Sequence, residues 1–163
     1  MNTLNIYLGT LRSENTKKSY GKDLRYMLSY IGKDESEITL VDLLGWVNHM
    51  KENNNSTATI ARRVGSAKRY FEFLSDMDLI ETNPAKKLKA PRIVNKVEPS
   101  LTSEDVNNII ASATNPRDKA IVAMLASTGM RISELINITL SDFEGNDIHI
   151  VGKGSKRRVV HIN

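Results

Sequence analysis

Apolar residues recur at helical spacing through the first half of the chain. Between residues 13 and 32 and between 56 and 74 they line one face of an α-helix, mostly three or four residues apart: Tyr20, Leu24, Met27, Leu28 and Ile31, then Ile60, Val64, Ala67, Phe71 and Leu74. A third helix is expected after Thr39, with Val41, Leu44, Val47 and Trp46 as its inward candidates. Ser13 and Ser56 suit helix starts, and Gly32 suits a helix end. We therefore predict an all-helical bundle up to about residue 83.

The second half of the chain changes its pattern twice. Thr102 with Asp105 three residues later predicts a helix start. Pro116 opens an apolar run at 117–127, which predicts a helix buried on most sides. After Gly129 a short helix is expected at 131–136. Residues 147–151 and 157–162 then alternate, which predicts two strands joined by a basic, glycine-rich turn.

A basic segment separates the two halves. Residues 85–98 hold five lysines and arginines and one acid, and Pro84 and Pro91 lie at or near their start. Such a composition predicts an extended, positively charged linker. The sequence therefore predicts three parts: a helical domain at 1–84, a linker at 85–99 and a second domain at 100–163.

Composition narrows the classes of function. The 163 residues include no cysteine, which excludes disulfides and thiolate metal sites. No run approaches the roughly 18 apolar residues that a membrane span needs. His49, His149 and His161 have no metal-ligand spacing, so neither a metal nor a small-molecule cofactor is expected. We expect a soluble protein of the cytoplasm.

The two longest predicted helices each carry basic residues opposite their apolar face. Lys18, Lys22 and Arg25 lie on one, and Arg62 and Arg69, with Ser66 between them, lie on the other. Two such faces beside a basic linker favour duplex DNA, whose phosphates accept hydrogen bonds from arginine, lysine and hydroxyl groups. Ordinary solvated faces are the simpler alternative. A membrane surface is less suitable because no helix pairs a basic face with exposed large apolar residues.

Two short stretches of the second half have the residue types that phosphate chemistry requires. Residues 128–135 read Thr-Gly-Met-Arg-Ile-Ser-Glu-Leu, and Glu134 lies one helical turn from Arg131, where it can orient the guanidinium. Lys153 lies between two glycines on the predicted hairpin, where a compact cation can approach a backbone closely. Each stretch also has a purely structural interpretation. Arg131 and Glu134 could form an ordinary ion pair at a helix start, and Lys153 could lie on a solvated basic turn.

Both stretches resemble motifs of the tyrosine recombinases, the phage integrase and Xer-type family. The resemblance includes Asp118 upstream of residues 128–135 and reaches the first half through residues 13–16, Tyr20, Asp23, residues 61–64 and 70–74, and Asn83-Pro84. It implies a mainly α protein: a SAM-like core-binding bundle that clamps duplex DNA, followed by the helical and β-hairpin first part of a catalytic domain. Arg131 would hold the scissile phosphate, supported by Glu134, and Lys153 would serve the leaving oxygen.

The resemblance also supplies the candidate DNA contacts and partners. With the basic faces it gives Asn15, Thr16, Lys18, Lys22, Arg25, Thr59, Arg62, Arg63, Ser66, Arg69, Lys156 and Arg158 as DNA-binding residues. For Lys156 and Arg158, contact with the DNA backbone and simple solvation both remain open. The implied partners are a duplex recombination site and, in a full-length protein, other recombinase protomers.

Family features that follow the hairpin cannot be placed in this chain. These are the second arginine with its histidine, a further histidine or tryptophan, and the nucleophilic tyrosine; all five tyrosines precede Arg131. We therefore expect the N-terminal part of a site-specific recombinase that binds duplex DNA without cutting it. One alternative is a short non-catalytic DNA-binding regulator derived from a recombinase. Another is a helical adaptor that binds protein through its basic faces.

Overall fold

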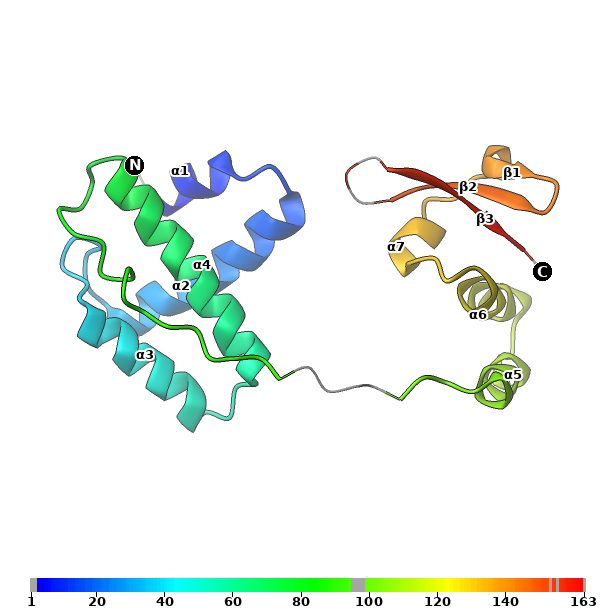
Figure 1. Cartoon of the computed structure of the whole chain (residues 1–163), viewed down its shortest axis with the longest axis horizontal. Coiled ribbons are helices and arrows are strands. Elements are labelled where there is room, and N and C mark those ends of the chain that lie inside the picture. The colour runs from blue at the N-terminus through cyan, green and yellow to red at the C-terminus, as the bar shows by residue number, and fades with distance from the viewer. Residues whose placement is uncertain (1–2, 95–98, 153, 155, 163) are drawn as a thin grey trace. The chain divides into compact units, whose positions relative to one another are not determined.

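The computed structural model describes residues 3–94, 99–152, 154 and 156–162. The chain divides into two compact units, residues 1–96 and 97–163. The first is a helical bundle and the second combines helices with a small sheet (Figure 1). The predicted mainly α fold class is confirmed. None of the helices within the described residues is long and apolar enough to cross a membrane.

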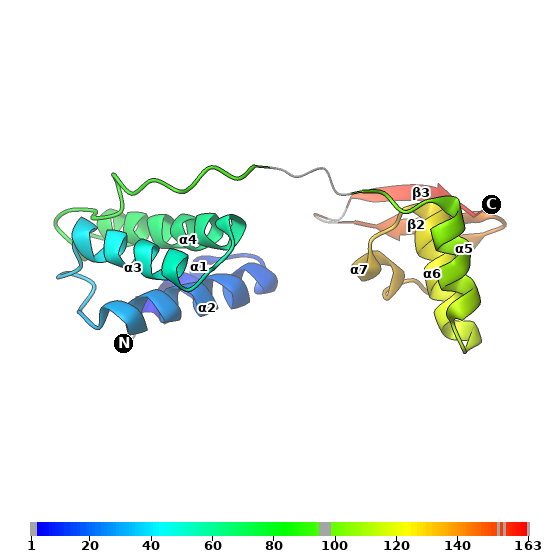
Figure 2. The same ribbon diagram turned by 90° about the horizontal axis from the view of Figure 1, so that it is seen from below.

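Residues 3–94 of the first unit form four helices: α1 (Thr3–Thr10), α2 (Glu14–Ile31), α3 (Leu40–Glu52) and α4 (Thr57–Asp76). In Figures 1 and 2, α4 lies against α2, and α3 packs on both. The predicted caps are present: the hydroxyls of Ser13 and Ser56 accept from the backbone N–H groups of Thr16 and Thr59. Gly32 ends α2 with a φ of 66°, a conformation that favours glycine. The sequence pattern missed α1.

The core of the first unit lies where the four helices meet. Its largest fully buried side chains include Trp46, Tyr70, Phe71, Leu24 and Met27. The predicted inward face of α3 is partly wrong, because Val41 and Leu44 are exposed while Leu43 is fully buried. The buried stripe is Leu43, Trp46, Val47 and Met50. Enclosing the large Trp46 ring turns this stripe inward and leaves Val41 and Leu44 in solvent.

Part of the predicted linker belongs to this core. Ala85 and Leu88 are buried in it, and the Lys68 ammonium donates to the carbonyl oxygen of Leu88 at 3.1 Å. The first unit therefore extends past the boundary predicted at residue 84. The apolar side chains at 85 and 88 anchor the segment to the bundle, whereas Lys86, Lys87 and Lys89 are exposed.

The described residues of the second unit form three helices, a 3₁₀ turn and a three-stranded sheet. Its elements are α5 (Ser103–Ser112), α6 (Pro116–Thr128), α7 (Ile132–Leu135), η1 (Leu140–Asp142), β1 (Phe143–Glu144), β2 (Asp147–Val151) and β3 (Arg157–His161). The strands are antiparallel in the order β1-β2-β3, and Ile150 of β2 lies opposite Arg158 of β3. The predicted hairpin is therefore present, whereas β1 was not predicted.

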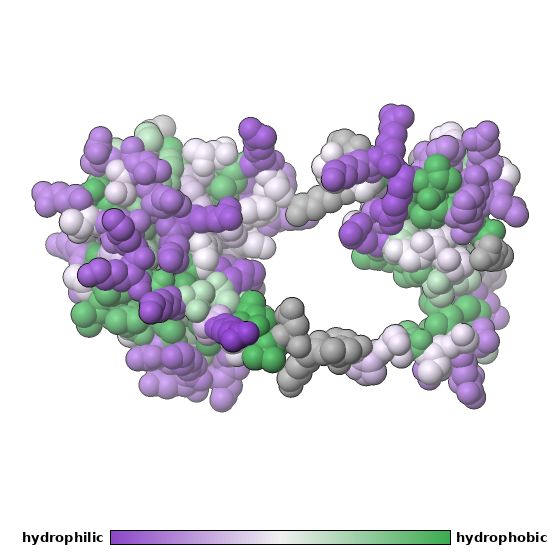
Figure 3. Space-filling model, viewed as in Figure 1, coloured by the Kyte–Doolittle hydropathy of each residue, from purple (hydrophilic) through white to green (hydrophobic). Residues whose placement is uncertain are grey.

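A small apolar cluster holds the second unit together. Met130, Ile148 and Ile150 are buried, and Met124 and Leu125 of α6 pack against them. The prediction that α6 is buried on most sides is wrong, because none of its residues is fully buried. α6 contacts α5, α7 and β3, but its apolar residues stay partly or fully exposed. Hydrophobic patches are visible on this unit in Figure 3, beside hydrophilic side chains.

Candidate phosphate site and nucleic-acid interface

Arg131 lies in the bend between two helices. Gly129 ends α6 with a φ of 60°, and α7 starts directly after Arg131. The backbone N–H of Arg131 donates to Glu134 Oε2 at 2.7 Å, and its Nη1 donates to Glu134 Oε1 at 3.0 Å. The predicted Arg131–Glu134 contact is therefore present. The Arg131 side chain is still 68% exposed, so much of its guanidinium faces solvent.

Glu134 is a buried carboxylate that binds two arginines. Its side chain is only 4% exposed, and Arg158 of β3 binds it with Nη1 2.8 Å from Oε1 and Nη2 2.9 Å from Oε2. The hydrogen bonds from Arg158, then that from the Arg131 backbone, outweigh burial and lower the pKa of Glu134 to about 2. The same pair raises the pKa of Arg158. Glu134 therefore stays ionised at neutral pH and links α7 to the hairpin.

Gly152 allows the hairpin to approach this carboxylate. A Cβ atom at this position would lie 3.0 Å from Glu134 Oε1 and 3.5 Å from Arg158 Nη1. The Gly152 N–H donates to the Lys156 carbonyl oxygen at 2.7 Å and closes the turn. Lys153, the predicted donor to the leaving oxygen, lies outside the described residues. A methyl group at position 152 would crowd the Glu134 carboxylate, so the carboxylate or the hairpin would have to shift by a few tenths of an ångström.

The structure gives Arg158 a role that the sequence did not predict. Its guanidinium has two donors on Glu134 and so links β3 to α7, while the side chain stays 40% exposed. A signal for this was present in the strand alternation: Arg158 lies opposite Ile150, on the inward phase of β3. Lys156 is exposed, as both of its interpretations require.

The basic faces of the first unit lie on two helices that pack together. Exposed on them are six of the predicted DNA-binding residues: Asn15, Lys18, Lys22, Arg25, Arg62 and Arg69. Thr16 and Thr59, in the first turns of α2 and α4, are partly buried. Hydrophilic side chains cover much of the face of this unit seen in Figure 3. The folded bundle therefore presents cations from α2 and from α4 to solvent.

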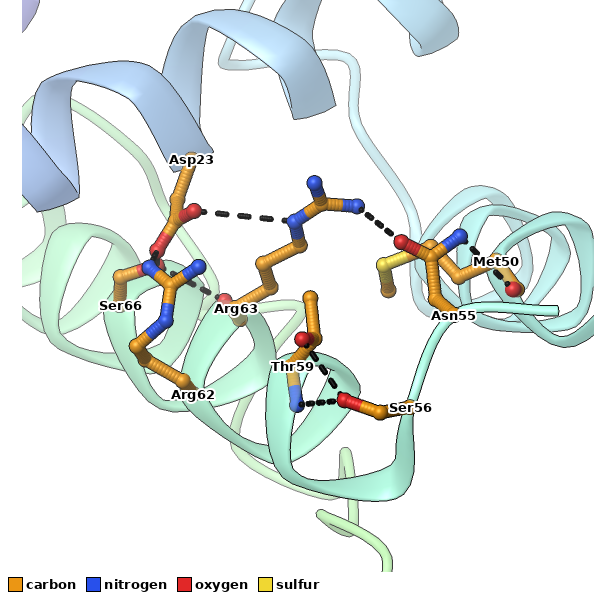
Figure 4. Close-up of polar contacts among 8 residues, drawn as sticks. All are labelled: Asp23, Met50, Asn55, Ser56, Thr59, Arg62, Arg63 and Ser66. Carbon is orange, nitrogen blue, oxygen red and sulfur yellow. Dashed lines mark hydrogen bonds and ion pairs between the residues drawn. The ribbon is translucent and has the colours of Figure 1, made fainter. Parts of the chain in front are cut away.

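Three polar residues of α4 turn toward α2 around one buried acid (Figure 4). Asp23 of α2 is 1% exposed and forms ion pairs with Arg62 and with Arg63, whose Nε lies 3.6 Å from Oδ1. The Ser66 hydroxyl donates to the Arg63 carbonyl oxygen at 2.9 Å, and its Oγ lies 3.5 Å from Asp23 Oδ2. Sequence reasoning missed this role of Asp23.

Two predicted DNA contacts are corrected by this cluster. Ser66 is fully buried, so it does not lie on an exposed basic face. The Arg63 side chain is 16% exposed; its Nη1 donates to Asn55 Oδ1 at 3.1 Å, and its guanidinium lies 4.4 Å from the centre of the Tyr26 ring. The side of α4 that faces α2 thus includes polar residues beside its apolar stripe, because Asp23 binds them there. Arg62 remains 47% exposed.

Potential metal ligands are scattered in the described parts of both units. Within those residues no group of three or more His, Asp or Glu side chains is arranged to hold a metal ion. His161 and Asp147 form a surface pair on the hairpin, and His149 lies 3.1 Å from Glu144.

Two family models match the chain in succession. The N-terminal SAM-like domain of phage integrases matches residues 4–77, and the phage integrase family matches residues 99–163. The tyrosine recombinase XerD of Halalkalibacterium halodurans is 32% identical over 162 residues, which cover 92% of this chain and 54% of that protein. XerC of Corynebacterium efficiens is 32% identical, with 91% and 50% covered.

Solved integrase structures share the fold. A lambda integrase dimer bound to a COC′ core site matches with a TM-score of 0.81 at 16% identity, over 99% of this chain and 49% of that chain. The Tn1549 transposon integrase in complex with circular intermediate DNA matches with a TM-score of 0.64 at 22% identity, over 100% and 61%. The architecture is thus an integrase fold, as far as the chain extends.

The matches to family models and relatives go further than fold. The chain belongs to the phage integrase family, whose Xer relatives are tyrosine recombinases. It spans about half the length of the curated relatives that it matches.

Proposed function

We propose that this chain is the DNA-binding and phosphate-holding part of a recombinase that acts at specific duplex sites. The observation that carries the proposal is the arrangement at Arg131, whose guanidinium is held by buried Glu134 on one side and is exposed on the other. A planar guanidinium can donate to two phosphate oxygens at once. Because Glu134 fixes its orientation in advance, Arg131 would stabilise negative charge that develops on the non-bridging oxygens.

The leaving 5′-oxygen requires a proton, and we assign that role to Lys153. Support comes from the neighbouring residues: Gly152 lies against the Glu134–Arg158 pair, so the turn begins beside the residues that hold Arg131. A lysine ammonium is a compact donor that can serve a departing oxygen. Arg131 and Lys153 would thus act on the same phosphodiester: Arg131 would stabilise the negative charge, and Lys153 would protonate the leaving oxygen.

Duplex binding is assigned to α2 and α4. Lys18, Lys22 and Arg25 on α2 and Arg62 and Arg69 on α4 are exposed cations on two packed helices. Phosphate neutralisation by such side chains releases counterions, so affinity should fall steeply with salt. We propose duplex DNA and other protomers as partners; similar lambda integrase structures are described as a dimer on a core site and a tetramer on a Holliday junction.

The chain by itself should bind DNA without cleaving it. Its five tyrosines are Tyr7, Tyr20, Tyr26, Tyr30 and Tyr70, all in the first unit. Tyr7 and Tyr70 are buried in the core, where burial raises their pKa. Residues 97–163 contain no tyrosine, so this unit does not itself supply the nucleophile that would act beside Arg131.

Two experiments test the proposal. Replacing Arg62 and Arg69 together with alanine should weaken binding to a fluorescent duplex, whereas the control pair Lys33→Ala and Lys51→Ala removes two charges elsewhere and should have a small effect. Unchanged binding by the first pair would remove α4 from the interface.

Incubation with a nicked suicide duplex should give no covalent adduct on a denaturing gel, and an adduct would contradict the assignment of inactivity.

A further inference from the structure

The Asp23 carboxylate lies between α2 and α4, with two arginines of α4 on it (Figure 4). The two arginines have different surroundings. Arg63 is enclosed by Asp23, Asn55 and the Tyr26 ring. Arg62 places Nη1 on Asp23 Oδ2, and its side chain is 47% exposed. Within the described residues, Asp23 is the partner that the structure gives Arg62.

Helix packing alone does not require this acid. Removing a carboxylate and its partners from water costs free energy that their attraction only partly returns, and apolar residues of similar volume often pack as well. A carboxylate does one thing that an apolar side chain cannot, because it sets the direction of a guanidinium. The Arg62 nitrogen on Asp23 is fixed, so the rest of the planar group must point away from the carboxylate.

The charge balance permits the outer side of Arg62 to bind an anion. One carboxylate faces two guanidinium groups, so the Asp23 cluster keeps a net positive charge. Arg63 also donates to Asn55, which directly precedes the Ser56 cap of α4. The cluster therefore fixes the start of α4 as well as Arg62. A side chain that is ordered before binding loses less conformational freedom when a phosphate binds.

We propose that Asp23 is a positioning residue for duplex binding, which holds the Arg62 guanidinium in the orientation that receives a DNA phosphate. This inference rests on the proposed function of α2 and α4. Asp23 itself has no access to DNA, because it is buried beneath the side chains that it orients.

A double-mutant cycle on the whole chain tests the proposal. Duplex affinity is measured at one low salt concentration for the parent chain, Asp23→Asn, Arg62→Ala and the double variant, below the unfolding temperature of each. We expect Asp23→Asn to weaken binding about 5- to 10-fold in the parent chain and less than about 2-fold when Arg62 is alanine. Asp76→Asn, on the exposed end of α4, is the control for the added positive charge.

The outcomes separate positioning from its alternatives. Equal weakening by Asp23→Asn in both backgrounds would assign Asp23 to general folding and overturn the inference. Unchanged or tighter binding by Asp23→Asn would overturn it too. If Arg62→Ala alone has no effect while the parent chain binds, Arg62 does not contact DNA and this inference fails. The proposal that α2 binds the duplex would be unaffected by that result. Absence of binding by the parent chain would instead refute the proposed function.

A second variant leaves Asp23 intact in case Asp23→Asn does not fold. Arg62→Lys keeps the charge but lacks the planar fork that can bind Asp23 and a phosphate on opposite sides. We expect it to lose most of the affinity that Arg62→Ala loses. Full rescue of affinity by lysine would show that charge alone is needed, and the positioning role would be refuted.

Discussion

Arg158 binds Glu134 through both terminal nitrogens of its guanidinium, at 2.8 and 2.9 Å. The pair joins the second strand of the hairpin to the short helix that follows Arg131. Since each Glu134 oxygen also accepts a hydrogen bond from Arg131, the three residues form one network. The orientation of Arg131 therefore depends on a residue 24 positions away from Glu134 in the sequence.

Replacing Glu134 with glutamine should loosen the second unit. The amide cannot accept four hydrogen bonds from two arginines, and the two positive charges would then face each other across a neutral group. We expect faster amide hydrogen exchange in α7 and β3. Trp46 is the chain's only tryptophan and lies in the first unit, so its fluorescence should be unchanged. Glu144→Gln, at an exposed position, is the matched control, and unchanged protection at Glu134→Gln would contradict the network.

Acid should weaken the second unit in a defined pH window. The folded-state pKa of Glu134 lies at about 2, below its ordinary value of 4.5, so its contribution is complete above about 4.5 and is lost as pH falls toward 2. The Glu134→Gln variant should lack this part of the pH dependence. Asp105, Asp118 and Asp142 also have lowered pKa values, so some acid sensitivity should remain. Hydrogen exchange across pH 5 to about 2 measures the difference; identical profiles would contradict the assignment.

A methyl group at position 152 should disturb the same network by contact. Gly152→Ala places a Cβ atom 3.0 Å from Glu134 Oε1, so the hairpin or the carboxylate must shift. We expect changed chemical shifts for Glu134 and Arg158 and faster exchange in β3. Gly65→Ala is the control, because a Cβ there has no atom within 4 Å and alanine favours the helix by about 0.5–1 kcal/mol. If the β3 amides exchange at the same rate in Gly152→Ala and Gly65→Ala, the steric argument is wrong.

The corrected face of α3 predicts unequal effects of neighbouring substitutions. Leu43→Ala removes a fully buried side chain and should lower the free energy of unfolding of the first unit by about 2–5 kcal/mol. Val41→Ala, at a side chain that is 76% exposed, should change it by less than about 0.5 kcal/mol. Urea unfolding followed by Trp46 fluorescence measures both. An equal loss of unfolding free energy in the two variants would show that Val41 packs in the core and would contradict the assigned face of α3.

Local spacing predicted much of the fold and one contact of the site. The long helices α2 and α4 have one clear apolar stripe, and the Arg131–Glu134 contact spans a single helical turn. Spacing failed on α3, where apolar residues surround Asp42 and only the packing of Trp46 selects a face. It also cannot reveal partners that are distant in sequence, such as Asp23 with Arg62, 39 positions apart. Arg63 and Ser66 were predicted as DNA contacts for the same reason.

The central claim, that α2 and α4 bind duplex DNA through its phosphates, is tested most directly by the salt dependence of binding. Five exposed cations on the two helices predict that the logarithm of the association constant falls with the logarithm of salt concentration with a slope of roughly −3 to −5. Lys18→Ala combined with Lys22→Ala should reduce the magnitude of this slope by about 2. A chain that does not bind duplex DNA at low salt, or binds with a slope near zero, would contradict the account.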